Sequence, residues 1–259
     1  MFSLPMLIHP EALESMIAMH HMIEAEGLTK NYGNVTAVDR ISLNVAEGEL
    51  FGLLGPNGSG KTTMIRMLTG QVRPTSGSAR VMGLDVVENP VRVREVVGII
   101  PEQETPPSFL TAGEYLRFVA RIRNLDGIDE QCDRWFDLLE FSDKRDVLCK
   151  DLSRGTRQKL MFAQAFLHEP RLVLIDEPLI NLDPIMQRKV KDFLRGYTRD
   201  GGTVFLSTHI LGIAEEICDR IGIIHNGRLL YTGPVDDLTG SGRHLESFFL
   251  DLVRGDAGG

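Results

Sequence analysis

The stretch that decides the fold is Gly55-Pro56-Asn57-Gly58-Ser59-Gly60-Lys61-Thr62. It follows the apolar residues 50–54, which predict a short strand, and precedes residues 62–68, whose spacing predicts a helix. At such a junction the glycines let consecutive backbone N–H groups converge on phosphate oxygens, and the helix N-terminus adds positive charge. We therefore predict a nucleotide-phosphate site. Lys61 is expected on the β- and γ-phosphates, Thr62 on Mg²⁺, and Thr63 beside them.

The loop alone leaves the class of nucleotide enzyme open, because kinases, GTPases, helicases and transport ATPases share it. Recognition of guanine would need an NKxD-type acceptor for the base. Residues 143–146, Asp-Lys-Arg-Asp, do not supply one.

A second predicted strand ends in two carboxylates. Residues 172–175 are Leu-Val-Leu-Ile, and Asp176 and Glu177 follow directly. A carboxylate at the end of such a strand orients Mg²⁺, which is the role we predict for Asp176. Glu177, one residue further on, is placed to accept a proton from the water that attacks the γ-phosphate, a contribution of about 10² to 10⁴ in rate. The two segments together predict hydrolysis of a nucleoside triphosphate.

Strands and helices alternate outward from these segments. Residues 172–175 and 204–206 are typical of short buried strands, and a helical pattern over 185–197 lies between them. Crossover connections of this length imply a parallel sheet. Residues 22–28 and 37–45 alternate apolar and polar side chains, as a half-buried antiparallel pair does. We expect an α/β fold with a parallel-sheet core and an antiparallel β subdomain.

The rest of the chain adds helices and a hairpin. Thr111-Ala112-Gly113-Glu114 has the spacing of a capping box, and a helical subdomain is expected over about 105–167. Asn226-Gly227 joins two short apolar segments, which predicts a β-hairpin. We expect an N-terminal extension at 1–21 that is not a signal peptide, an ATPase domain at 22–240, and a C-terminal helix with a flexible tail at 241–259.

Composition excludes several other functions. The 259 residues carry a formal net charge of -8, which argues against nucleic acid as the main partner. The three cysteines are widely spaced and form no CxxC pair, so neither a zinc site nor a disulfide framework is indicated. No apolar run approaches the roughly 18 residues that span a bilayer. A membrane role would depend on another polypeptide.

The motifs together resemble those of ATP-binding-cassette (ABC) ATPases. The resemblance covers roughly residues 22–237, and it rests on the order and spacing of the phosphate loop, Leu152-Ser153-Arg154-Gly155-Thr156, Asp176-Glu177-Pro178, Leu182-Asp183-Pro184 and Ser207-Thr208-His209. It implies a P-loop NTPase cassette with a RecA-like core, ATP and Mg²⁺ as ligands, and a second ABC subunit, most simply another copy. ATP would then lie between the two subunits.

The resemblance also implies roles for single residues. Ser153 and Gly155 match the signature loop Leu-Ser-Gly-Gly-Gln, which binds the nucleotide of the opposite subunit, whereas Arg154 and Thr156 depart from it. Asp183 matches an aspartate at the dimer seam. The preceding residues 179–181, Leu-Ile-Asn, differ from the commoner Thr-Ser-Gly.

Three further positions complete the implied site. His209 would contact the γ-phosphate and help to position the attacking water. Tyr32 falls where an aromatic ring stacks on adenine, although it is also compatible with a turn aromatic. Glu102 occupies the position of a glutamine that meets Mg²⁺ or water in the family, with Gln103 beside it. A carboxylate there can still meet the metal, but it adds repulsion against the γ-phosphate.

The signature variant is similar to that of single-cassette subunits that power separate permeases, such as multidrug or sodium exporters. This resemblance implies a cytoplasmic protein held at the inner face of the cell membrane by integral permease subunits. The alternative is a soluble ABC ATPase of a cofactor-assembly complex or another non-transport complex. The substrate is not readable, because its contacts lie on another chain.

Overall fold

The computed structural model describes residues 21–103, 106–239 and 244–256. The predicted N-terminal extension therefore lies outside the described residues except for His21, and so do the first residues and the glycine-rich end of the predicted C-terminal segment. His21 already belongs to the first strand, β1 (His21–Tyr32).

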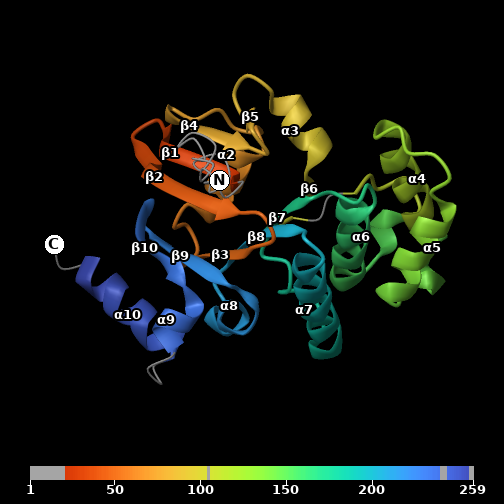
Figure 1. Ribbon diagram of the computed structural model, residues 1–259. Coiled ribbons are helices and arrows are strands. Elements are labelled where there is room, and N and C mark those ends of the chain that lie inside the picture. The colour runs from red at the N-terminus through yellow and green to blue at the C-terminus, as the bar shows by residue number, and fades with distance from the viewer. Residues whose placement is uncertain (1–20, 104–105, 240–243, 257–259) are drawn as a thin grey trace, which may run out of the picture.

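The central sheet contains the predicted parallel core (Figure 1). Its six strands are β3 (Leu50–Leu54), β6 (Gly98–Ile100), β7 (Leu172–Asp176), β8 (Thr203–Thr208), β9 (Arg220–His225) and β10 (Arg228–Pro234). The order is β10-β9-β3-β8-β7-β6, and only the β9–β10 pair is antiparallel. Strands β3, β8 and β7 are fully buried. Because they are parallel neighbours, their carboxyl ends meet at one edge of the sheet, where parallel sheets bind ligands.

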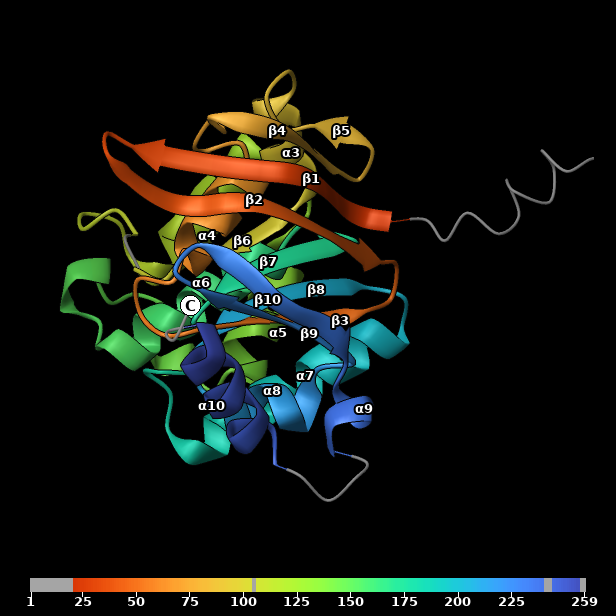
Figure 2. The same ribbon diagram turned by 90° about the vertical axis from the view of Figure 1, so that its left-hand side faces the viewer.

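A second sheet is antiparallel and lies beside the first (Figure 2). It has the order β2-β1-β4-β5, with β2 (Val35–Ala46), β4 (Ser76–Val81) and β5 (Leu84–Asp85). Helix α2 (Lys61–Leu68) follows the phosphate loop and shares one hydrophobic core with this sheet and one face of the central sheet. The predicted antiparallel subdomain is confirmed. Strands β4 and β5 and helix α3 (Pro90–Val96) were not predicted.

Three helices form a lobe at the far side of β6 (Figure 1): α4 (Ala112–Ile122), α5 (Asp129–Leu138) and α6 (Arg154–Phe166). The predicted capping box opens α4, because Thr111 Oγ1 accepts from the Glu114 N–H at 3.2 Å and the Glu114 carboxylate accepts from the Thr111 N–H at 2.9 Å. Trp135 of α5 packs on Phe166 of α6 with ring centroids 5.6 Å apart.

The last part of the chain covers the other face of the central sheet. It contains α7 (Pro184–Arg199), α8 (Leu211–Ile217), α9 (Val235–Thr239) and α10 (Leu245–Asp256). The β9–β10 turn has positive φ at Asn226 (47°) and Gly227 (78°), which confirms the predicted hairpin. Within the described residues, no helix combines the length and apolar character needed to cross a bilayer. The three cysteines are free and buried.

Candidate functional site

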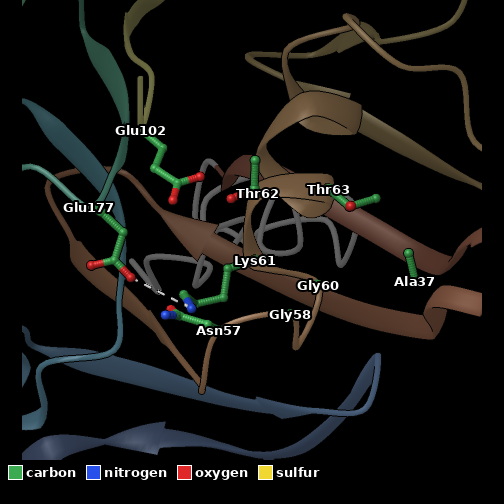
Figure 3. A pocket seen from close by; sticks show the side chains of 9 residues that line it. All are labelled: Ala37, Asn57, Gly58, Gly60, Lys61, Thr62, Thr63, Glu102 and Glu177. Carbon is green, nitrogen blue, oxygen red and sulfur yellow. Dashed lines mark ion pairs between the residues drawn. The ribbon is translucent and has the colours of Figure 1, made fainter. Parts of the chain in front are cut away.

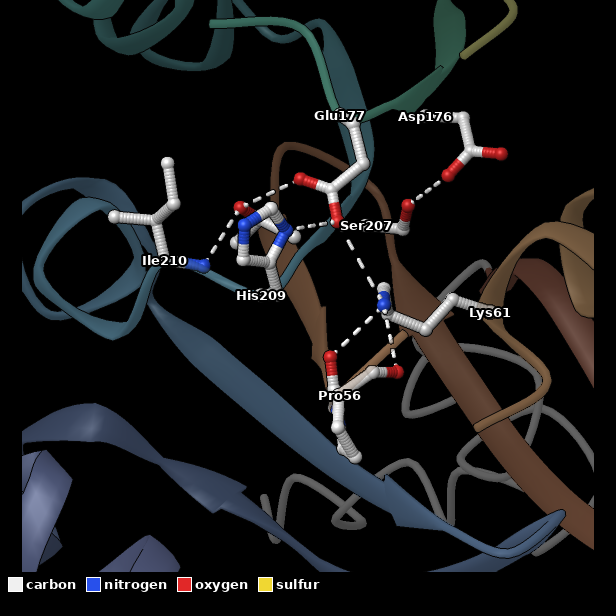
Figure 4. A network of polar contacts seen from close by, with 9 residues as sticks. Pro56, Lys61, Asp176, Glu177, Ser207, His209 and Ile210 are labelled. Atoms are coloured by element: carbon white, nitrogen blue, oxygen red, sulfur yellow. Dashed lines mark hydrogen bonds and ion pairs between the residues drawn. The ribbon is translucent and has the colours of Figure 1, made fainter. Parts of the chain in front are cut away.

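Strand register brings the predicted residues together. Leu54 of β3 pairs with Thr208 of β8, and Asp176 of β7 pairs with Ser207. The loop after β3, the carboxylates of Asp176 and Glu177 at the end of β7, and His209 after β8 therefore lie side by side at one edge of the sheet (Figure 4).

The phosphate loop is held in an open curve around Lys61. The Lys61 side chain is only 6% exposed. Its ammonium donates to the carbonyls of Gly55 at 2.8 Å and Pro56 at 3.2 Å, and it lies 3.6 Å from the Glu177 carboxylate. Gly60 has φ +113°, and a Cβ there would lie 2.4 Å from the Ala37 carbonyl oxygen. Only glycine suits that position.

A cavity of about 310 Å³ opens over the loop (Figure 3). Its lining residues are Ala37, Asn57, Gly58, Gly60, Lys61, Thr62, Thr63, Glu102 and Glu177. The Ser59 hydroxyl oxygen is buried nearby without a hydrogen-bond partner among the described residues. A buried polar atom of this kind calls for a partner, and a phosphate oxygen supplies one. The cradle therefore fits the polyphosphate of a nucleotide.

The two carboxylates at the end of β7 are held in place by hydroxyls of β8. The Ser207 hydroxyl donates to Asp176, and the Thr208 hydroxyl donates to Glu177 at 3.2 Å. His209 Nδ1 lies 2.8 Å from the other oxygen of Glu177, which therefore sits between His209 and Lys61 (Figure 4). Glu177 itself has φ +51°, a conformation that non-glycine residues rarely adopt.

Two of these partners, Ser207 and Thr208, were not predicted to hold the carboxylates. Their hydroxyls follow from the pairing of β7 with β8. Both belong to the motif Ser207-Thr208-His209 in the sequence, and only the register shows that they face Asp176 and Glu177. Ala37, which lines the cavity from β2, carried no chemical signal in the sequence.

The donors near Thr62 fit a hard divalent cation. Thr62, Asp176 and Glu102 together line a second hollow of about 220 Å³, and Thr62 and Glu102 also line the first. In the described part of the chain, no three His, Cys, Asp or Glu residues lie close enough to hold a metal alone. This agrees with Mg²⁺, which is usually bound by one or two protein oxygens together with substrate phosphates and water.

Ser153, Gly155, Asp183 and Tyr32 were also predicted, and they line neither the cavity nor the adjoining hollow. Ser153 is an exposed N-cap of α6 that accepts from the Thr156 N–H at 3.1 Å, and Gly155 follows it in the first turn. Asp183 caps α7, and hydrogen bonds from the Met186 and Ile185 N–H groups hold the pKa of this exposed carboxyl below its usual range. Tyr32 is 47% exposed at the end of β1, with the Lys30 ammonium 5.1 Å from its ring.

The comparisons with known proteins agree with this site. A family model described as ABC transporter matches residues 38–180. The bacitracin transport ATP-binding protein BcrA of Enterococcus faecalis is 35% identical, over 90% of this chain and 76% of its own length. The daunorubicin/doxorubicin resistance ATP-binding protein DrrA of Streptomyces peucetius is 37% identical, over 85% and 67%.

A solved structure, titled as the ATP-binding subunit of an ABC transporter, is 30% identical. It superposes with a TM-score of 0.84, covering 89% of this chain and 99% of its own. The predicted cassette fold is thus confirmed, and the relatives' names support the transporter interpretation rather than the cofactor-assembly one. The phosphate loop, the strand-end carboxylates and these likenesses lead to one conclusion: the chain belongs to the ABC transporter family, as an ATP-binding subunit that hydrolyses ATP.

Proposed function

We propose that this subunit powers export through a separate membrane permease by closing on ATP as a head-to-tail pair of copies. One observation carries the proposal. The cavity of one copy gathers the phosphate loop, Glu102 and Glu177, whereas Ser153, the helix N-cap that resembles the family's phosphate contact, is exposed and lines none of it. Ser153 and Gly155 then complete the site of the second copy, with Asp183 at the seam.

In this arrangement each residue has a defined task. Lys61 and the backbone N–H groups of the loop bind the β- and γ-phosphates, while Thr62, Asp176 and Glu102 hold Mg²⁺, which neutralises phosphate charge when bound. Glu177 accepts the proton of the water whose oxygen attacks the γ-phosphorus as the bond to the ADP oxygen breaks. His209, bonded to the same carboxylate, keeps it oriented.

Hydrolysis then drives a change of state. The γ-phosphate links the two copies, so its loss removes the contacts that favour the closed pair, and the population shifts to the open pair. We place the working unit, residues 22–240, at the inner face of the cell membrane beside integral permease subunits. Names of the relatives, which refer to bacitracin transport and to drug resistance, support an exported cargo.

Two substitutions test the proposal. Glu177→Gln keeps the shape of the side chain and removes the base, so we expect ATP to trap a stable dimer with hydrolysis reduced at least about a hundredfold. Lys61→Ala removes the cation of the cradle, and we expect it to abolish tight ATP binding. Sedimentation with and without ATP measures the dimer, phosphate release measures hydrolysis, and titration with ATP measures binding. If Glu177→Gln hydrolyses ATP at the wild-type rate, the assignment of Glu177 as the base is wrong. If Glu177→Gln stays monomeric with ATP, the proposed ATP-dependent dimer is wrong.

A further inference from the structure

We propose that Arg154 contacts the triphosphate held by the second copy of the chain, and that it offsets the negative charge which Glu102 adds to that site. The inference rests on the proposed head-to-tail dimer. Two positions in the site motifs differ from the family pattern by a full charge. One is the carboxylate of Glu102 in place of an amide, and the other is the guanidinium of Arg154 in place of a glycine.

The cavity of one copy is poor in positive charge. Among its lining residues, Lys61 is the one cation, against the carboxylates of Glu102 and Glu177 (Figure 3). The Lys61 ammonium is partly neutralised already, because it lies 3.6 Å from Glu177. A triphosphate adds several negative charges, more than Lys61 and a bound Mg²⁺ balance, so the additional carboxylate opposes binding. Arg66 lines the adjoining hollow with Glu102, but no arginine lines the cavity itself, so a cation from the second copy would lower the remaining repulsion.

Arg154 is such a cation at the complementary surface. It is the first residue of α6 and is exposed, and the first turn of that helix contains no acidic residue, although this position usually favours Asp or Glu. Arg157, one turn along, is already used, because its guanidinium donates to the Leu152 carbonyl at 2.8 Å. Across the described residues, no hydrogen bond or ion pair involves the Arg154 side chain.

Local contacts hold the backbone at the start of α6, and so the position of this arginine, in place. The hydroxyls of Ser153 and Thr156 lie 2.8 Å apart, which ties the signature loop to the first turn. A Cβ on Gly155 would lie 2.8 Å from the Asn181 carbonyl oxygen, so the helix packs directly on the loop that leads to Asp183. Arg154 follows Ser153 directly and is exposed at this fixed helix start, and a guanidinium there can bond phosphate oxygens in a fixed geometry.

The test uses the Glu177→Gln protein as parent and measures the ATP concentration that gives half-maximal dimer by sedimentation. Arg154→Ala should raise that concentration about tenfold or more, the loss expected for one charge-assisted hydrogen bond. Arg154→Lys should give an intermediate value. Glu102→Gln combined with Arg154→Ala should bring the value back to within about threefold of the parent, since the repulsion is removed together with its counter-charge. Arg121→Ala, which removes an exposed arginine of α4, is the matched control and should have no effect.

The outcomes separate the two proposals. A parent that forms no ATP-dependent dimer refutes the proposed function. A parent that dimerises, with Arg154→Ala unchanged from it, refutes only the trans contact. If Arg154→Ala weakens the dimer and Glu102→Gln does not restore it, the charge compensation is wrong. Melting curves of the Arg154 variants should coincide with that of the parent, because the exposed Arg154 side chain forms no hydrogen bond or ion pair with the described residues.

Discussion

At the scale of single residues, the phosphate loop depends on a backbone conformation that only glycine adopts cheaply. Gly60 combines φ +113° with a neighbouring carbonyl oxygen 2.4 Å from where a Cβ would be. Gly58 also has positive φ, +79°, but it has open space around it. We expect Gly60→Ala to lower the free energy of unfolding by more than about 2 kcal/mol, and Gly58→Ala by about 1 kcal/mol.

Urea unfolding of the two variants measures the difference, and nucleotide titration should show that Gly60→Ala also weakens ATP binding. Gly58→Ala is the control for positive φ alone. Equal losses in both variants would show that the contact with Ala37 yields and that the steric argument is wrong.

Single site residues could be predicted from the sequence where their chemistry depends only on their own segment. Lys61, Thr62, Asp176 and Glu177 belong to segments whose chemistry is local, and all four lie at the cavity or the adjoining hollow. Adenine stacking by Tyr32 stays a prediction. The hydrogen bonds from the Ser207 and Thr208 hydroxyls to Asp176 and Glu177 depend on strand register, which no local sequence pattern specifies.

At the scale of elements, the junction between α6 and the edge of the sheet contains His168, which is half-buried. Burial, together with the charge of Arg123, lowers the pKa of His168 to about 4. Arg123, directly after α4, donates to the carbonyls of Glu95 in α3 and of Val97, the residue that precedes β6, so it joins α4 to the end of α3. Protonation of His168 in the folded state therefore opposes the packing of the helical lobe.

The sign of the pH effect follows from the lowered pKa. The unfolded chain binds a proton at His168 near pH 6.5, whereas the folded chain does so only near pH 4. His168 therefore lowers the free energy of unfolding as pH falls from about 6.5 to 4, and it causes no further loss below about pH 4. We expect His168→Gln to lose less stability than wild type across this window, measured by urea midpoints. An unchanged slope in His168→Gln would contradict the prediction.

Elements with strong periodicity or capping were predicted, and those that depend on distant partners were not. The α4 capping box and the apolar strands β3 and β7 carry their signals locally. Strand β4 is Ser-Gly-Ser-Ala-Arg-Val and mostly exposed, and it forms because β1 offers its open edge. Such a strand has little β propensity of its own, so only the tertiary pairing reveals it.

At the scale of the whole molecule, the functional surfaces lie on different elements. The cavity over the loop lies between α2 and the strand ends, and Ser153 and Asp183 cap the N-termini of α6 and α7. The helical lobe carries a stripe of exposed apolar residues. On α4, Phe118 and Ile122 are 47% and 64% exposed, one helical turn apart, while Leu116 and Val119 face the core.

This stripe is the surface we expect the permease to contact. Phe118 and Ile122 are exposed, and the adjoining Arg123 bonds the carbonyl of Val97, directly before β6. Because β6 leads to Glu102, a displacement of α4 by a permease would be passed towards the proposed magnesium site. Phe118→Ser with Ile122→Ser should leave the ATP-driven dimer intact but remove the polytopic partner that co-purifies from detergent-solubilised native membranes. Leu138→Ser, at an apolar residue of α5 that is 45% exposed, should keep the partner. If the double variant retains the permease at the wild-type ratio, the contact surface lies elsewhere on the subunit.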